Sequence, residues 1–307
     1  MEYLLLVLGF ALLIKGADWF VDGAADAAAR LRVPQVIVGL TIVSIGTSLP
    51  ELSVSLTAAI QGSNALALSN VVGSNLFNTL VVVGCSVILA PFAMSREIRY
   101  RDTTWNFGIT ALLAVLAIGG MIGRIDGFVL LAALAVYLVI LVRSALASRK
   151  ATQDAPASET PVWKILALIV VGVACIGFGG NMTVDAAKAI ALSWGWSEAL
   201  VGLTIVSIGT SLPELVTSVV AARKGESGLS IGNALGSNIM NIGFILGLSS
   251  AIHPIAVVAE NMVDILILLA VALFILVMSW RSARLTRAKG WLFVALYACY
   301  FAYILLR

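Results

Sequence analysis

Long apolar segments alternate with short polar loops along the whole chain. Five segments lie in the first half, near 3–29, 33–61, 64–90, 103–122 and 126–144, and five in the second half, near 164–191, 197–223, 227–251, 259–281 and 289–306. A helix needs about 20 apolar residues to cross the roughly 30 Å of hydrocarbon in a bilayer. The pattern therefore predicts an all-α membrane protein with ten transmembrane helices.

The two halves of the chain repeat each other at one fixed spacing. Residues Val38–Leu52 read VGLTIVSIGTSLPEL, and Val201–Leu215, 163 positions later, read the same. The same spacing relates the GSN triplet at Gly73–Asn75 to the one at Gly236–Asn238. Matches at one spacing along the chain indicate an internal repeat of a whole structural unit.

The repeat predicts the domain organisation. The first five-helix repeat covers 1–144, the second covers 164–307, and 145–163 is a polar linker rich in Ala, Ser, Thr and Pro. An odd number of spans in each copy places the second copy upside down in the membrane. We therefore expect two inverted repeats.

The positions of the basic residues predict the orientation. If the N-terminus is outside, alternate loops and the linker are cytoplasmic, and fifteen of the nineteen Lys and Arg residues lie in or beside them. Basic residues are enriched in cytoplasmic loops. We expect a multi-pass protein of the cell (inner) membrane, with both termini outside and the linker in the cytoplasm.

Composition excludes a soluble fold of this length. Hydrophobic residues make up 61% of the chain and charged residues only 11%, against about a quarter charged in a soluble domain. The sequence contains neither the HExxH metalloprotease motif nor the GxSxG nucleophile motif. We expect no enzymatic activity, no cofactor, no nucleic-acid partner and no obligatory protein partner.

The repeated SIGTSLPE block is unusual for a membrane helix. Pro50 has no backbone N–H and interrupts the helical hydrogen bonds near Gly46, which predicts a broken helix with carbonyls freed between Ser44 and Thr47. Glu51 places a carboxylate in an otherwise apolar segment, and such charges mark ion pathways. Irregular backbone at membrane depth is tolerated where it lines a cavity or is buried in protein.

These groups predict a site for a hard cation. Carbonyls, hydroxyls and carboxylates are the oxygen ligands that Ca²⁺ prefers, and sulfur and imidazole are absent from the block. Inversion brings the second copy, with Glu214, to the same depth, as at the repeat interfaces of secondary transporters. Ser74 and Asn78 in the third segment, and Ser237 and Asn241 in the eighth, share a helix face and add neutral oxygens.

With these motifs, the sequence resembles the Ca²⁺/cation antiporter superfamily, and the prokaryotic Na⁺/Ca²⁺ exchangers in particular. Both copies carry both GTSLPE and GSNxxN, and the resemblance covers the whole chain. It implies a secondary antiporter that exchanges Ca²⁺ for Na⁺ across the bilayer by alternating access, with Ca²⁺ and Na⁺ as transported ions.

The resemblance also implies residue roles. Glu51 and Glu214 would chelate Ca²⁺. The other implied ligands are Thr47 and Thr210, the Na⁺-binding serines Ser48, Ser211, Ser74 and Ser237, the mid-site Asn78 and Asn241, and the carbonyls of Ser44 and Ser207.

Several alternatives stay open. The H⁺/Ca²⁺ branch of the superfamily also uses paired glutamates, so an H⁺/Ca²⁺ exchanger is the alternative function. Some relatives, including K⁺-dependent exchangers, carry Asp at the position of Asn241, and the amide here makes K⁺ co-transport the weaker alternative. We interpret the other membrane asparagines (Asn70, Asn75, Asn233, Asn238) as helix-packing residues, and the aspartates of the first and sixth segments (Asp18, Asp22, Asp185) as structural or gate-lining.

Overall fold

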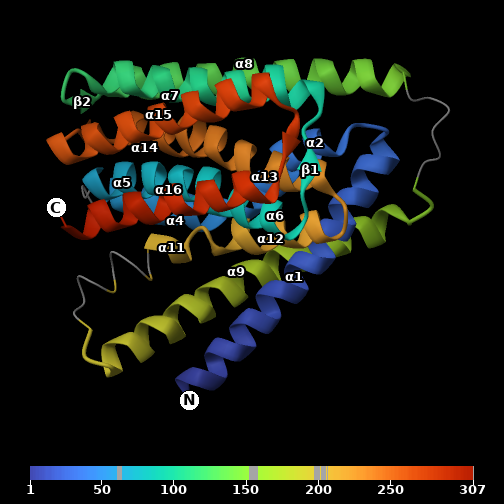
Figure 1. The fold of residues 1–307 in the computed structure, drawn as a ribbon, viewed down its shortest axis with the longest axis horizontal. Coiled ribbons are helices and arrows are strands. Elements are labelled where there is room, and N and C mark those ends of the chain that lie inside the picture. Colours follow the sequence, from blue (N-terminus) through green and yellow to red (C-terminus); the bar gives the residue numbers. More distant parts are fainter. Residues whose placement is uncertain (61–63, 152–157, 197–200, 202–204, 206, 307) are drawn as a thin grey trace.

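The computed structural model describes residues 1–60, 64–151, 158–196, 201, 205 and 207–306. It is a helical bundle with two short β-ribbons (Figure 1). Within the described residues, seven helices are long and apolar enough to cross a membrane, and the broken helix 35–60 makes an eighth. Part of the predicted segment 197–223 lies outside the described residues, and the helix at 103–117 is shorter than a full span. The count of ten therefore stays a prediction.

The first half contains the following elements: α1 (Glu2–Leu31), α2 (Gln35–Val38), the π-helix η1 (Gly39–Val43), α3 (Ser44–Thr47), α4 (Leu49–Ile60), α5 (Asn64–Phe77), the π-helix η2 (Asn78–Val82), α6 (Val83–Leu89), β1 (Phe92–Ala93), the π-helix η3 (Ile98–Asp102), α7 (Thr103–Ala117), β2 (Met121–Ile122) and α8 (Arg124–Ala151). Helix α8 continues past the predicted end of the repeat at 144, because the Ala, Ser, Arg and Lys residues that follow are compatible with a helix.

The second half contains α9 (Val162–Ser193), α11 (Ser207–Gly209), α12 (Leu212–Arg223), α13 (Ser227–Met240), the π-helix η5 (Asn241–Leu246), α14 (Gly247–Ile252), β3 (Ile255–Ala256), α15 (Ala259–Arg281), β4 (Arg284–Leu285) and α16 (Arg287–Leu306). Most of these ends agree with the apolar segments read from the sequence.

Helices α1 and α9 form an inclined pair beside the rest of the bundle (Figure 1). Glycines at seven-residue spacing on both helices bring the two backbones together. A Cβ atom built on Gly16 would lie 2.9 Å from the carbonyl oxygen of Gly172, and one on Gly179 would lie 2.6 Å from the backbone nitrogen of Leu13. Small residues that allow such close approach are a general means of helix packing in membranes.

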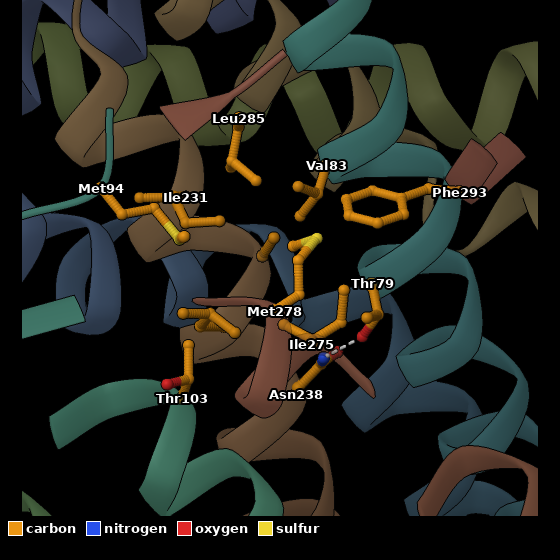
Figure 2. A pocket seen from close by; sticks show the side chains of 12 residues that line it. Thr79, Val83, Met94, Thr103, Ile231, Asn238, Ile275, Met278, Leu285 and Phe293 are labelled. Atoms are coloured by element: carbon orange, nitrogen blue, oxygen red, sulfur yellow. Dashed lines mark hydrogen bonds between the residues drawn. The ribbon is translucent and has the colours of Figure 1, made fainter. Parts of the chain in front are cut away.

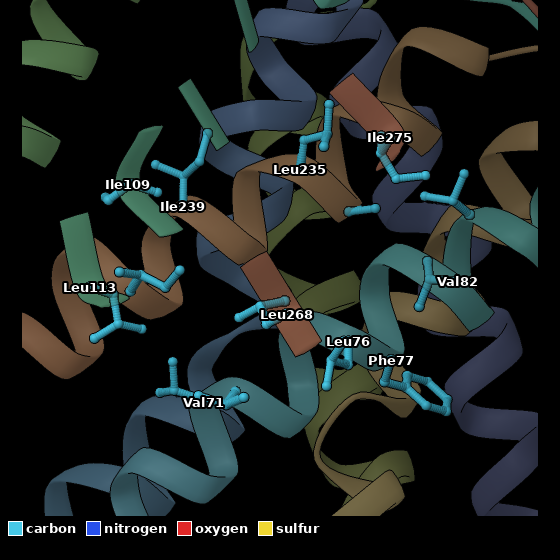
Figure 3. Packing of buried hydrophobic residues seen from close by; sticks show 14 of the residues in the cluster. Val71, Leu76, Phe77, Val82, Ile109, Leu113, Leu235, Ile239, Leu268 and Ile275 are labelled. Atoms are coloured by element: carbon cyan, nitrogen blue, oxygen red, sulfur yellow. The ribbon is translucent and has the colours of Figure 1, made fainter. Parts of the chain in front are cut away.

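The centre of the bundle is formed by α5–α6 and α13–α14. In the most apolar 18 residues of each segment, 78% and 72% of the residues are buried. The corresponding share in the other unbroken candidate spans is at most 39%. The apolar side chains of α5–α6 and α13–α14 pack with α7 and α15 in one continuous core, which includes Leu76, Leu235 and Leu268 (Figure 3). The helices that carry the GSN triplets are therefore the least exposed to lipid.

Two β-ribbons join the repeats at their loops. Strand β1 pairs with β4 and β2 pairs with β3, both antiparallel. At the spacing of 163, β1 is equivalent to β3 and β2 to β4. Each ribbon thus joins one strand of each repeat, and the two ribbons are equivalent to each other under the repeat.

Candidate ion-binding site

The predicted break in the second segment is present. The run Gln35–Thr47 and helix α4 are bent by 52° about Ser48, and Ser48 has non-helical dihedral angles (φ −84°, ψ 10°). Its repeat equivalent Ser211 precedes α12 with nearly the same angles (φ −93°, ψ 6°). Each break lies two residues before the proline that lacks an N–H.

The backbone around Ser44 differs from the prediction in one detail. The Ser48 N–H donates to the Ser44 carbonyl at 3.0 Å, and the Ser44 hydroxyl donates to the Leu40 carbonyl at 3.0 Å. The Ser44 carbonyl is therefore not free, because the helix stays hydrogen-bonded up to the break. The side chain of Ser207, its repeat equivalent, lies outside the described residues.

The two glutamates are fully buried, and each is bound by the repeat to which it does not belong. Ser48 donates its hydroxyl hydrogen to Glu214 Oε1 at 3.0 Å, and Ser211 donates to Glu51 Oε1 at 3.1 Å. Ser237, from the same repeat as Glu214, reaches the same Oε1 at 3.4 Å. Each SLPE block supplies a glutamate and a serine that binds the other block's glutamate, so the two carboxylates share one site. The structure thus brings both SLPE blocks together at one place.

Several oxygens around this pair have no hydrogen-bond partner among the described residues, although they are buried. Leaving a buried polar group unpaired costs free energy, and native structures contain few such groups. Those that belong to predicted site residues are Glu51 Oε2, Glu214 Oε2, Ser74 Oγ, Asn78 Oδ1 and Asn241 Oδ1. They come from both repeats and together resemble the oxygen set that a hard cation requires.

Asn78 and Asn241 are the first residues of the π-helices η2 and η5. Segment η2 packs against α12, which carries Glu214, and η5 packs against α4, which carries Glu51. The two amides are not equivalent in their contacts. Asn241 Nδ2 donates to Asn75 Oδ1 at 3.0 Å, whereas neither amide atom of Asn78 has a partner among the described residues. Single-turn π-helices inside α-helices occur frequently at functional sites.

Asn233 holds both broken helices. Its amide nitrogen donates to the Glu214 carbonyl at 3.3 Å and to Ser218 Oγ at 2.9 Å, and its oxygen accepts the Thr47 hydroxyl at 2.9 Å. Asn70, its repeat equivalent, contacts the Glu51 carbonyl at 3.4 Å, and Thr210 reaches its oxygen at 3.5 Å. These asparagines therefore fix the backbone on which the glutamates stand, as packing residues would.

Asn238 lines a separate cavity between the repeats. Its amide nitrogen donates to Thr79 Oγ1 at 2.8 Å, beside a cavity with the apolar lining residues Val83, Ile231 and Phe293 (Figure 2). The residues that line this cavity include no charged side chain, so it cannot hold an ion by charge. Asn238 thus belongs to the packing between the repeats.

A buried aspartate outside the site is fully paired. Asp102 accepts hydrogen bonds from the Arg101 guanidinium, at 2.6 and 3.0 Å, and from the Tyr137 hydroxyl at 3.1 Å. Sequence reasoning did not single it out, because Asp102 lies at the end of a segment rich in arginine. These hydrogen bonds occupy the carboxylate, which thereby joins the end of η3 to α8.

The comparisons with known proteins identify the family. The family model described as sodium/calcium exchanger protein matches residues 1–143 and 164–306. The chain belongs to the sodium/calcium exchanger family. Membership of a family of transporters confirms the prediction that this exchanger is not an enzyme.

Two curated relatives and one solved structure illustrate the likeness. The putative antiporter CaxA of Alkalimonas amylolytica is 36% identical over 92% of this chain and 90% of its own length. The sodium/calcium exchanger MaX1 of Methanosarcina acetivorans is 29% identical over 97% of both. The solved exchanger NCX_Mj superposes with a TM-score of 0.86 at 33% identity, covering 98% of this chain and 97% of that one. The likeness confirms the predicted all-α fold with inverted repeats in a multi-pass membrane protein.

Proposed function

We propose that this chain is a secondary antiporter in which Ca²⁺ and Na⁺ compete for the oxygens around Glu51 and Glu214. The observation that carries the proposal is the set of buried, unpaired oxygens contributed by both repeats. Family membership supports the choice of these two ions. They are transported ions, and we propose no resident cofactor.

Charge explains why one site can serve both ions. Two ionised carboxylates carry a charge of −2, which one Ca²⁺ or two Na⁺ neutralise. Without an ion, two like charges in a buried site are strongly unfavourable. If the protein switches between its outward-open and inward-open states only when this charge is neutralised, each switch must carry bound Ca²⁺ or bound Na⁺ across the membrane. Mutually exclusive occupancy of shared ligands is then sufficient for exchange.

The neighbouring serines support Na⁺ as the coupling ion. Ser48, Ser211 and Ser237 already lie against the carboxylates. Binding of a Na⁺ ion between the serine and carboxylate oxygens therefore requires little movement of these side chains. The neutral Asn241 leaves two carboxylates at the site, which favours exchange without K⁺. We propose that the protein lies in the cell membrane with both termini outside and the 145–163 linker in the cytoplasm, as the basic residues indicate.

Competition between the ions gives a direct test of the shared site. In the detergent-solubilised protein, we expect Na⁺ to displace bound radioactive Ca²⁺ completely, while choline at the same ionic strength does not. Equilibrium dialysis measures the bound Ca²⁺. If Ca²⁺ and Na⁺ bind together without affecting each other, the ligands are not shared and the proposal is wrong.

A further inference from the structure

Lys224, which follows α12, ties this helix to α1. Its ammonium group contacts Asp22 Oδ1 at 2.7 Å, the carboxylate of Asp18, and the backbone oxygen of Asp18 at 3.0 Å. Asp18 and Asp22 are four residues apart on one face of α1. One lysine of the second repeat therefore holds two carboxylates of the first.

Apolar side chains fill the space between the same two helices. Leu13, Ala17 and Val21 of α1 are buried in one cluster, and Val216 and Val220 of α12 pack against it. Helices α1 and α12 are therefore in direct contact on the side toward which α12 runs, and we call this the closed contact. The end of the linker lies on the same side, because the Ser158 hydroxyl donates to Asp26 Oδ1 of α1 at 2.7 Å.

The space between α4 and α9, which are the repeat equivalents of α12 and α1, is open. A cavity of about 440 Å³ lies between α4 and α9 and reaches Thr47 and Thr210. Its lining includes Ser53, Asn181 and Asp185, all of them exposed. At the spacing of 163, these are the equivalents of Val216, Asp18 and Asp22.

The residue types also differ between the two places. The closed contact has Val216, Val220 and Lys224, whereas the equivalent positions in the first repeat hold Ser53, Thr57 and Gln61. Gln61 itself lies outside the described residues. If α4 and α9 came into the same contact, more polar side chains would be buried than between α12 and α1. No lysine would then reach Asp185 of α9.

We propose that Lys224, with Asp18 and Asp22, is a latch that keeps the linker side of the protein closed and biases the ion-loaded exchanger toward the opposite opening. The inference rests on the proposed alternating access, in which inverted repeats exchange their arrangements between the two states. When α1 and α12 separate as α9 and α4 do here, Lys224 must leave both carboxylates. The opposite state gains no such ion pair in return, so its population is lowered.

The test measures how often the latched contact opens. Val216→Cys places a thiol in the apolar contact, and its rate of reaction with a charged methanethiosulfonate reagent scales with the population of the open form. The detergent-solubilised full chain is used with saturating Ca²⁺, which neutralises the two glutamates and so permits the change of open side. The protein without the introduced cysteine gives the background from Cys85, Cys175 and Cys299.

Adding Lys224→Gln, which supplies the residue type of the first repeat, is expected to raise this rate by about two- to five-fold, as for the loss of an exposed ion pair. Lys15→Gln is the matched control, because Lys15 also contacts Asp18 but lies on α1 itself. We expect no change with this control. High concentrations of an inert salt should raise the rate in the parent protein and leave Lys224→Gln unaffected.

An unchanged rate in Lys224→Gln, or an equal rise in Lys15→Gln, would overturn the proposal. If Lys224→Gln does not fold, Asp22→Asn provides the same test with one contact removed. The labelling rate does not depend on transport. A protein that failed to exchange Na⁺ for Ca²⁺ could still show the latch, so the two proposals fail separately.

Discussion

Replacing either Glu51 or Glu214 by glutamine is expected to abolish Ca²⁺ transport. The substitution keeps the shape of the side chain and removes one of the two charges that balance a divalent ion. Both carboxylates are fully buried, so water cannot make up for the lost charge. Tracer Ca²⁺ flux in vesicles measures the effect, and we expect flux at the level of empty vesicles.

The variants should still fold and insert. Each glutamine keeps an oxygen that can accept the hydrogen bond now made by Ser211 or Ser48. Elution as a single species in detergent checks this point. Glu260→Gln is a suitable control, because it is the same substitution at an exposed carboxylate in the first turn of α15. Wild-type Ca²⁺ flux in Glu51→Gln would contradict the assignment of the site.

Gly16→Ala is expected to lower the melting temperature of the detergent-solubilised protein by about 2–12 °C. The added methyl group would lie 2.7 Å from Cys175 Cβ and 2.9 Å from the Gly172 carbonyl oxygen. Two of its neighbours are backbone atoms of α9, so α1 and α9 must move apart. Overpacking of this kind costs about 1–3 kcal/mol, and 1 kcal/mol corresponds to roughly 2–4 °C in a protein of 150–250 residues.

Gly108→Ala is the matched control for this change. A Cβ atom at Gly108 in α7 meets no atom within 4 Å, and alanine favours a helix over glycine by about 1 kcal/mol. Its melting temperature should therefore stay the same or rise. If Gly16→Ala is as stable as Gly108→Ala, the close packing of α1 on α9 is not a source of stability.

The sequence was sufficient for the fold class because apolar length and the exact repeat of Val38–Leu52 leave little freedom. A bilayer demands helices of a given length, and Pro50 identifies the break without further information. The π-helices at Asn78 and Asn241 were not predicted. They depend on how the whole backbone packs, and the residues of those segments are compatible with an ordinary α-helix.

The candidate site was predicted as a set of residues, but its pairing across the repeats was not. Nothing in the sequence says that Ser48 contacts Glu214 instead of Glu51, because that contact depends on how the inverted copies meet. The different hydrogen-bond partners of Asn78 and Asn241 cannot be predicted for the same reason, because both residues occupy equivalent positions in the repeat. Lys224 was read as an orientation signal, and only the fold brings it to Asp18 and Asp22.

The central claim is that a Na⁺ gradient drives Ca²⁺ across the membrane through this protein. The most direct test is Ca²⁺ uptake into vesicles that contain the protein and are loaded with Na⁺ or choline, at equal pH on both sides. Rapid uptake into the Na⁺-loaded vesicles alone, unchanged by added K⁺, is the predicted result. Equal uptake into both kinds of vesicle, together with uptake driven by an imposed pH gradient, would contradict the claim and identify a proton-coupled exchanger.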